Sequence, residues 1–420
     1  MALRAMRCVI IPVFGLLVLA GDAGAAEREA ARASTSPYPI VTDARLGGDD
    51  NQTRFIADIT KKVEIRAFML ADPYRVVIDI PQVAFRLPAK VGETGRGLVK
   101  AFRFGLVMQG GSRIVLDLNK PARIEKAFVL DAAEGHPARI VLDLVPTDRE
   151  SFLNALKANV KTQNPAETSR KPDPPKAEPP SKADPRPVVV LDPGHGGIDN
   201  GTRAASGESE KALVLDFALA LRTQIEKAGK YRVVMTRIDD SFVALAERVR
   251  IARANQAALM ISIHADALKK TDGEAQGATI YTLSDTASDT EAARLADTEN
   301  RADVIAGIDL SSEPDDVAGI LIDFAQRETK AFSLHFAKTL AAELKSVARL
   351  HKHPLKSAGF KVLRAPDVPS VLIELGYVSN QQDLKQLTSG SWRSRTVAST
   401  VQAIDTFFAT RIAGAPAGPN

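Results

Sequence analysis

Eight prolines lie within residues 162–187, TQNPAETSRKPDPPKAEPPSKADPRP, a stretch without valine, isoleucine, leucine or aromatic residues. Such a stretch cannot bury apolar surface, and its prolines favour an extended, semi-rigid chain. We therefore predict a proline-rich linker over residues 146–187 that separates two modules, residues 37–145 and residues 188–412, with a short tail at 413–420. A chain of 420 residues also exceeds one typical hydrophobic core, which agrees with two domains.

The first residues have the layout of a secretory signal peptide. Arg4 and Arg7 precede an apolar run at residues 8–20, and the small-residue site AGAA follows at residues 23–26. We expect residues 1–25 to be removed, which leaves an exported protein without a stable membrane anchor. A retained anchor is the alternative, although the apolar run is short for a membrane span.

Three segments of the first module follow one template: a basic residue, Ala-Phe, a turn, then Arg, apolar residues and Asp. The segments are RAFMLADPYRVVIDI, KAFRFGLVMQGGSRIVLDL and KAFVLDAAEGHPARIVLDL. Alternating apolar residues separated by turns predict a small all-β sandwich, with Val76, Ile78 and Ile80 on one side of a strand. We interpret the repeated charges as cross-strand pairs on a solvated face, with ligand binding as the alternative; they are Arg75/Asp79, Arg113/Asp117 and Arg139/Asp143.

The second module alternates predicted strands and helices. This rhythm predicts an α/β fold with a mostly parallel sheet flanked by helices, whose ligands lie beyond the carboxyl ends of the strands. The expected strands are residues 188–191, 231–236, 258–263, 277–283 and 370–374, and the expected helices are residues 211–228, 243–254, 332–345 and 392–410.

Two histidines follow apolar strands of this sheet, His195 in LDPGHGG and His264 in ISIHADA. The glycines around His195 match neither a dinucleotide fingerprint nor a P-loop, so a phosphate site is disfavoured. Glu210 begins an amphipathic helix from which it can reach the strand ends, and Glu208 is a competing candidate. Two histidines and one carboxylate with an open position form a catalytic Zn²⁺ set. The only cysteine, Cys8, lies in the signal segment and offers no alternative ligand.

An acid also ends the apolar strand in PSVLIELGYVSN. Because burying the charge of Glu374 is unfavourable unless it is paired or used, we expect this residue to act as general base beside the metal. Asp192 and Asp266 lie near the two histidines. Each is a candidate acceptor for an imidazole N–H, with turn formation as the alternative.

These residues lie in motifs that resemble the zinc-dependent N-acetylmuramoyl-L-alanine amidases of cell division. The motifs are VVLDPGHGGIDNG, ESEKALVLDFALAL, VVMTRIDDSFVALAERVRIARAN, LMISIHADA, GATIYTLS and LKSAGFKVLRAPDVPSVLIELGYVSN, in order over nearly all of residues 188–412. The resemblance implies that His195, Glu210 and His264 hold Zn²⁺ and that Glu374 is catalytic, and its Glu-Lys pair favours Glu210 over Glu208. One difference is Asp266, where the family often has asparagine.

The resemblance also implies a biological setting. The reaction would be hydrolysis of the amide between N-acetylmuramic acid and L-alanine in peptidoglycan, during septal splitting and daughter-cell separation. The repeats of the first module resemble the AMIN domain, which in that family binds peptidoglycan and directs the enzyme to the division site. We therefore expect a periplasmic protein, enriched at the septum.

An acidic insert at residues 284–328 carries twelve acids and three arginines. Ala292, Leu295, Ala296 and Ala302 form a helical stripe, and Glu299 lies within it, where a lone acid needs a partner. Division amidases have a helix here that covers the active site. We hypothesise that Glu299 occupies the open metal position, which makes the enzyme autoinhibited. Pairing of Glu299 with Arg301 or Arg248 is the alternative.

Release from this inhibition would need a partner, which the family suggests is a LytM-domain activator, and an acidic helix at residues 316–326 is a candidate docking surface. The formal charge of +4 gives no strong case for nucleic acid. The remaining alternatives are another zinc peptidase or deacetylase of the cell wall, or a wall-binding regulator without activity.

Overall fold

The computed structural model describes residues 37–88, 90–108, 110–133, 135–162, 184–267, 276–307 and 321–413. The predicted signal peptide, half of the predicted linker (residues 163–183) and the tail at 414–420 lie outside these residues. None of the helices in the described ranges combines the length and apolar character needed to cross a membrane.

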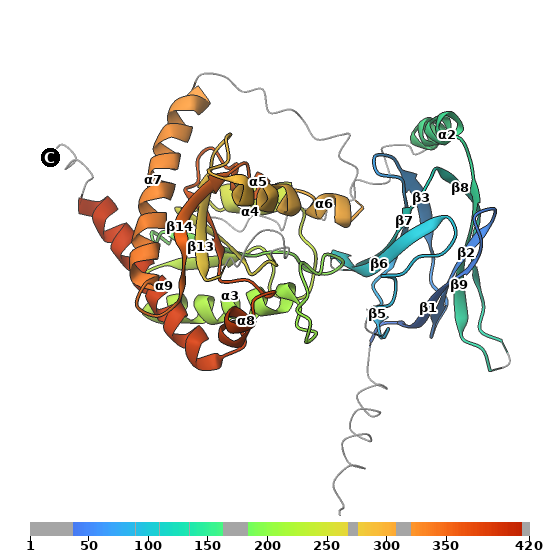
Figure 1. The fold of residues 1–420 in the computed structure, drawn as a ribbon, viewed down its shortest axis with the longest axis horizontal. Coiled ribbons are helices and arrows are strands. Elements are labelled where there is room, and N and C mark those ends of the chain that lie inside the picture. The colour runs from blue at the N-terminus through green and yellow to red at the C-terminus, as the bar shows by residue number, and fades with distance from the viewer. Residues whose placement is uncertain are drawn as a thin grey trace, which may run out of the picture.

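The N-terminal domain is a sandwich of two sheets (Figure 1). Its core takes alternate residues of the strands, so that Val76, Ile78 and Ile80 point inward, and the predicted all-β sandwich is confirmed. One sheet has the order β5-β1-β2-β9-β8, formed by Ala84–Phe85, Ile40–Gly48, Thr53–Ile59, Ala138–Pro146 and Ala122–Leu130. The other has the order β3-β4-β7-β6, formed by Arg66–Leu70, Arg75–Pro81, Gly111–Leu118 and Val99–Met108.

A helix, α2 (Arg149–Thr162), follows this domain directly. Phe152 is fully buried in the sandwich core and packs edge-on against Tyr74, with 5.0 Å between ring centroids. The linker predicted to start at residue 146 is therefore placed too early, because the first turns of α2 belong to the N-terminal domain.

The C-terminal domain is built on a six-stranded sheet of order β11-β10-β12-β15-β13-β14. Neighbouring strands are parallel except for β13 and β15, which confirms the mostly parallel sheet. The strands are Arg232–Met235, Val188–Pro193, Leu259–His264, Ser370–Glu374, Ala278–Leu283 and Leu350–Ala358. Strand β14 was not expected from the sequence, where HKHPLK interrupts the apolar pattern.

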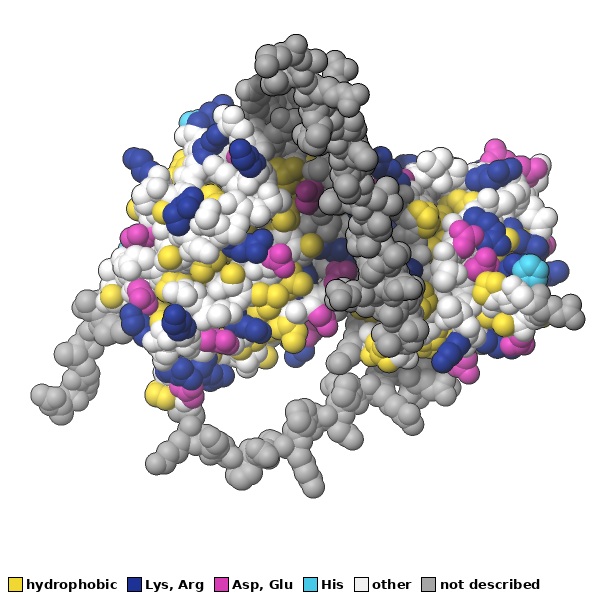
Figure 2. Space-filling model, turned by 90° about the horizontal axis from the view of Figure 1, so that it is seen from below, with side chains coloured by type: hydrophobic (Ala, Val, Ile, Leu, Met, Phe, Trp, Pro, Cys, Tyr) yellow, Lys and Arg dark blue, Asp and Glu magenta, His cyan; other side chains and the backbone are white. Residues whose placement is uncertain are grey.

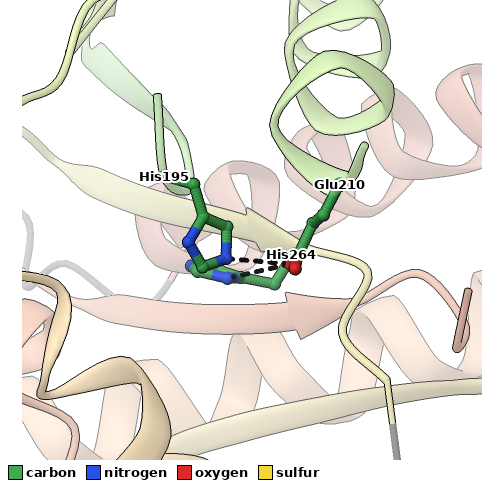
Figure 3. Close-up of side chains that lie close together, drawn as sticks. All are labelled: His195, Glu210 and His264. Atoms are coloured by element: carbon green, nitrogen blue, oxygen red, sulfur yellow. Dashed lines mark ion pairs between the residues drawn. The ribbon is translucent and has the colours of Figure 1, made fainter. Parts of the chain in front are cut away.

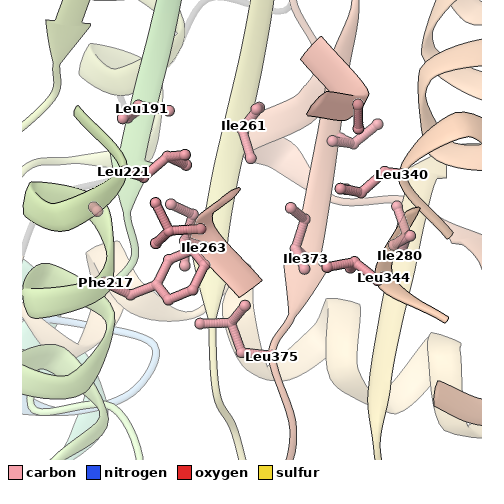
Figure 4. Packing of buried hydrophobic residues seen from close by; sticks show 14 of the residues in the cluster. Leu191, Phe217, Leu221, Ile261, Ile263, Ile280, Leu340, Leu344, Ile373 and Leu375 are labelled. Atoms are coloured by element: carbon pink, nitrogen blue, oxygen red, sulfur yellow. The ribbon is translucent and has the colours of Figure 1, made fainter. Parts of the chain in front are cut away.

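Helices cover both faces of this sheet (Figure 1). On one face, α3 (Glu210–Ala228), α7 (Leu321–Leu344) and α9 (Gly390–Ala413) bury a core that includes Phe217, Leu340 and Ile263 (Figure 4). The short α8 (Gln381–Leu387) adds Leu387 to it. On the other face, α4 (Leu245–Ala254), the 3-10 turn η3 (Lys361–Leu363), α5 (Thr290–Glu299) and α6 (Ala302–Ile305) bury a second core.

Helix α7 corrects the prediction of two separate helices at residues 316–326 and 332–345. It is continuous from Leu321 to Leu344, while residues 308–320 and the side chains of residues 321–326 lie outside the described part. The docking surface predicted there therefore remains a prediction.

The two domains share one hydrophobic cluster. Leu70, Val77 and Val115, on the outer face of the β3-β4-β7-β6 sheet, pack with the core that contains α5 and α6. The ladder places Arg113 opposite Asp79, and the two form an ion pair of 2.5 Å, so cross-strand pairing is present. The expectation of a solvated face is wrong for this sheet, because the C-terminal domain covers it.

Basic and acidic side chains are interspersed over both domains on the face seen in Figure 2. This mixture agrees with the small net charge of the sequence.

Candidate metal centre

The turn after β10 presents His195 at the carboxyl edge of the sheet. His195 has a φ of 58°, and the next two residues, Gly196 and Gly197, also have positive φ, so the chain reverses within a few residues. The N–H of Gly194 donates to the carbonyl of Ile263 at 2.9 Å, which ties the turn to β12. A Cβ on Gly194 would lie 2.3 Å from Cε1 of His264, so glycine is required for the two histidines to approach.

Three side chains converge at this edge from β12, the β10 turn and the first residue of α3 (Figure 3). Oε1 of Glu210 lies 3.1 Å from Nε2 of His195 and 3.4 Å from Nδ1 of His264. A tetrahedral ion with ligand bonds of about 2.0–2.1 Å separates its ligand atoms by roughly 3.3 Å. Both distances from the Glu210 oxygen are therefore compatible with a tetrahedral metal ion, and all three donor atoms lie within 4.8 Å of one another.

The unsatisfied polar atoms fit the same interpretation. Nε2 of His195 and Nδ1 of His264 are buried, and neither has a hydrogen-bond partner among the described residues. Buried polar atoms without partners are rare, and a cation would satisfy both nitrogens at once. Two imidazoles, one carboxylate and no thiol form a donor set suited to Zn²⁺.

A further carboxylate orients His195. Nδ1 of His195 lies 2.9 Å from Oδ2 of Asp199, so this nitrogen carries the proton and Nε2 is left for a metal. Burial lowers the pKa of His195, but the carboxylates of Glu210, Asp199 and Glu299 outweigh it and raise that pKa well above its ordinary value. Sequence reasoning missed Asp199. The only signal for it was the spacing of four residues within GHGGID.

Glu210 is fixed by backbone donors. Its Oε1 accepts from the N–H of Ala265 and its Oε2 from the N–H of Thr202, each at 2.9 Å. Glu210 is fully buried, and its pKa is well below the usual range because His195 and His264 outweigh the effect of burial. Glu208 is instead paired with the Ser206 hydroxyl at the surface, in agreement with the preference for Glu210.

Asp192 has a different place from the one expected. Its carboxylate accepts from Arg248 at 2.7 Å and from the hydroxyls of Thr236 and Ser262 at 2.6 and 2.7 Å. Burial raises the pKa of Asp192, but these donors outweigh it and lower the pKa. Arg248 also donates to the carbonyl of His195 at 2.8 Å. The buried Asp192–Arg248 pair therefore holds the backbone of the turn, and Asp192 does not accept from an imidazole N–H as expected.

Glu374 lies beside the three ligands. Strands β12 and β15 place it opposite His264, and its Oε2 accepts from the N–H of Asp266 at 3.0 Å, while its Oε1 has no partner in the described chain. Burial, followed by the carboxylates of Glu210, Asp266 and Glu299, raises the pKa of Glu374 well above its usual range. The side chain of Asp266 accepts from the Thr202 hydroxyl.

Glu299, the last residue of α5, reaches the same point. Its Oε2 lies 3.1 Å from Nδ1 of His264 and 3.7 Å from Nε2 of His195. Glu299 is 5% exposed, and burial raises its pKa to about 7 despite the opposing histidines. Arg248, one alternative partner, is occupied by Asp192.

Two families match the chain. Residues 189–406 match the family described as N-acetylmuramoyl-L-alanine amidase, and residues 43–144 match the AMIN domain. Among curated proteins, it is 32% identical over 378 residues to N-acetylmuramoyl-L-alanine amidase AmiC of Escherichia coli O6:H1, covering 88% of this chain and 89% of that protein. It is also 32% identical over 393 residues to AmiC of Neisseria meningitidis serogroup B, covering 90% and 92%.

Solved structures are more distant. The CwlD amidase of Clostridioides difficile, determined in complex with the GerS lipoprotein, is 24% identical, with a TM-score of 0.40. The match covers 54% of this chain and 100% of that chain.

Proposed function

The chain belongs to the N-acetylmuramoyl-L-alanine amidase family, and we propose that it hydrolyses peptidoglycan with Zn²⁺ held by His195, Glu210 and His264. The observation that carries the metal assignment is the convergence of three buried donor atoms: the Glu210 oxygen lies 3.1 and 3.4 Å from two nitrogens that have no hydrogen-bond partner among the described residues. The bond cleaved joins N-acetylmuramic acid to L-alanine.

Zn²⁺ at this site would polarise the scissile carbonyl and lower the pKa of a water molecule, so that the water can lose a proton and attack at neutral pH. Glu374 takes the proton from the attacking water and later gives it to the departing L-alanine nitrogen. Two features support this role: Oε1 of Glu374 is buried without a partner among the described residues, and its raised pKa allows the carboxyl to carry a proton between the two steps.

We further propose that Glu299 inhibits the enzyme by occupying the fourth position around the metal. Its oxygen lies at ligand spacing from both histidines, and α5 buries Ala292, Leu295 and Ala296 against the sheet. Substrate access then requires α5 to move. A LytM-domain protein is the activator that the family relationship suggests.

The N-terminal domain is proposed to bind peptidoglycan and to concentrate the enzyme at the division septum, in the periplasm. The support is the AMIN match over residues 43–144 together with the resemblance to division amidases. The periplasmic location also rests on the signal peptide predicted at residues 1–25.

Metal analysis together with digestion of purified peptidoglycan sacculi tests the proposed reaction. The full-length protein is expected to contain about one zinc per chain and to release stem peptides with a free L-alanine amino group. Glu374→Gln should keep the zinc and lose roughly 10²- to 10⁴-fold in rate, the usual contribution of a general acid–base residue. His264→Ala should lose both zinc and activity.

The products distinguish the alternatives. Cleavage within the stem peptide would indicate a zinc peptidase, and release of acetate a deacetylase. Binding to sacculi without any release, even with bound zinc and with Glu299 replaced by glutamine, would favour an inactive wall-binding regulator.

A further inference from the structure

A carboxylate-binding cluster lies under the other end of α5. Glu291, in the first turn of that helix, lies 2.9 Å from Nζ of Lys356 and 3.8 Å from Nε2 of His351, and accepts from the Tyr377 hydroxyl at 3.2 Å. Lys356 and His351 belong to β14, and Tyr377 follows β15. The C-terminal sheet and its loop therefore supply three donors to one carboxylate of the insert.

The lysine of this cluster is buried to an unusual extent. Its side chain is 2% exposed, and His351 and Tyr377 are buried as well. A buried ammonium group is strongly unfavourable unless an anion pairs with it. Among the described residues, the carboxylates within ion-pair distance of Lys356 are Glu291 and Asp289, at 2.9 and 3.3 Å, and both belong to the insert.

The same helix carries Glu299 at the metal centre. Because Glu299 must leave for a substrate to reach the metal, α5 has to move, and Glu291 moves with it. Lys356, His351 and Tyr377 would then line the opened surface without their anion. Glu291 and Glu299 are eight residues apart, so the cluster lies about 12 Å from the metal centre along the helix.

We propose that Lys356, His351 and Tyr377 bind a carboxylate of the substrate's stem peptide, and that Glu291 fills this site in the closed state. The inference rests on the proposed amidase function. A stem peptide is joined to the glycan through its amino end, so its other end carries a free carboxylate. A span of about 12 Å corresponds to roughly three or four extended residues, which is within the length of such a peptide.

The test compares two soluble muropeptides whose stems differ only at the terminal group, a free carboxylate in one and a primary amide in the other. The wild-type chain should hydrolyse the carboxylate form with a kcat/KM roughly tenfold higher or more, the effect of a charged hydrogen bond. In Lys356→Gln this ratio should fall to near one. Lys352→Gln, an exposed lysine on the same strand, should keep the wild-type ratio.

The ratio of the two kcat/KM values separates recognition of the substrate carboxylate from inhibition by α5. Losing the Lys356–Glu291 pair will also loosen α5, but the fraction of open enzyme is the same for both substrates and cancels. Should Lys356→Gln fail to fold, Tyr377→Phe removes only a hydroxyl and should lower the ratio by a smaller factor.

Hydrolysis of both muropeptides at equal kcat/KM by the wild-type chain, or an unchanged preference in Lys356→Gln, would overturn the inference and leave the amidase function intact. If neither muropeptide were hydrolysed by the zinc-loaded chain or by its Glu299→Gln variant, the proposed function would fail, and the inference with it.

Discussion

Because Gly201 has no side chain, it leaves room for two of the proposed metal ligands, His195 and Glu210, to approach each other. A Cβ at this position would lie 2.6 Å from Cδ2 of His195 and 2.7 Å from Oε2 of Glu210. Both atoms belong to side chains that hydrogen bonds already hold, His195 by Asp199 and Glu210 by Thr202, so neither can yield easily. The glycine is therefore part of the ligand geometry.

Gly201→Ala should weaken Zn²⁺ binding by tenfold or more, because the methyl group displaces one of the two ligands. Gly207→Ala is the matched control: Gly207 also has a positive φ, +109° against +59°, but its Cβ would meet no atom within 4 Å. Competition with a chelator measures the affinity. Equal zinc affinity in the two variants would show that backbone strain, and not the methyl contact, governs the site.

Asp199→Asn should weaken Zn²⁺ binding by roughly 10- to 100-fold, the usual effect of losing a carboxylate that orients a ligating histidine. The amide can still accept a hydrogen bond, but it no longer stabilises the ring electrostatically. Asp216→Asn, which changes an exposed acid of α3 paired with Arg393 away from the turn, is expected to retain wild-type affinity. A wild-type zinc affinity in Asp199→Asn would limit Asp199 to supporting the turn.

His195, His264 and Glu374 could be singled out because a polar residue at or just beyond the end of an apolar strand stands out in a sequence, and Glu210 because it begins an amphipathic helix. The position of Asp199 could not, since it depends on a turn in which His195 has a positive φ. Asp192 was assigned to the wrong neighbour for a related reason. Nothing in the sequence shows that Arg248, 56 residues later, occupies its carboxylate.

Helix α5 and strand β14 show which secondary-structure elements could be predicted from the sequence and which could not. Its apolar stripe predicted the helix and singled out Glu299, and the structure buries Ala292, Leu295, Ala296 and Glu299 as one face. Strand β14 was missed because its Lys356 and His351 are covered by α5 and not by an apolar layer. Its polar sequence therefore reflects a contact with an element some 60 residues earlier, which periodicity alone cannot reveal.

Glu299→Gln should raise hydrolysis by the chain without an activator, by roughly 10- to 100-fold, because a neutral amide is a poor ligand and binds histidines weakly. Asp297→Asn, on the exposed side of the same helix, should leave the basal rate unchanged. Dye release from labelled sacculi measures both rates. An unchanged or lower rate in folded Glu299→Gln would contradict autoinhibition.

This substitution is a cleaner test than deleting residues 285–327, for which the same model also predicts faster hydrolysis. Deletion would uncover Val190, Tyr281 and Phe360, which share a core with α5. A deleted protein that aggregates would therefore say nothing about inhibition.

At the scale of the whole molecule, the N-terminal domain contacts α6, which directly follows the helix that carries the proposed inhibitory Glu299. Arg75 donates to the carbonyl of Val304 at 2.7 Å, and Arg113 donates to those of Ala306 and Gly307 at 3.1 and 3.0 Å. Arg103 donates to the carbonyls of Val304 and Ile305. Three cations thus meet the carbonyls at the end of α6, where the helix dipole favours positive charge.

The repeated arginines are visible in the sequence, but the carbonyls of α6 to which they donate could not be predicted from it. Repeated Arg and Asp positions on strands resemble solvated cross-strand pairs; Arg113–Asp79 is a cross-strand pair, but it lies on a covered face. Only the packing of Val77 and Val115 against the C-terminal domain turns this sheet face into an interface. Domain contacts of this kind depend on the arrangement of two separately folded units, which no local pattern encodes.

These arginines hold α6 through its carbonyls, and residues 300–301 join α6 to α5. Removing arginine hydrogen bonds should therefore make α5 more mobile and release Glu299 from the proposed metal position more often. The double variant Arg103→Ala and Arg113→Ala should raise basal hydrolysis several-fold and speed amide hydrogen exchange in α5 and α6. Arg54→Ala removes an arginine of the other sheet, paired with Asp143, and should change neither. Faster hydrolysis without faster exchange would place the effect of the arginines on substrate binding. Unchanged values of both would mean that α5 is held by its contacts within the C-terminal domain alone, and that the N-terminal domain takes no part in inhibition.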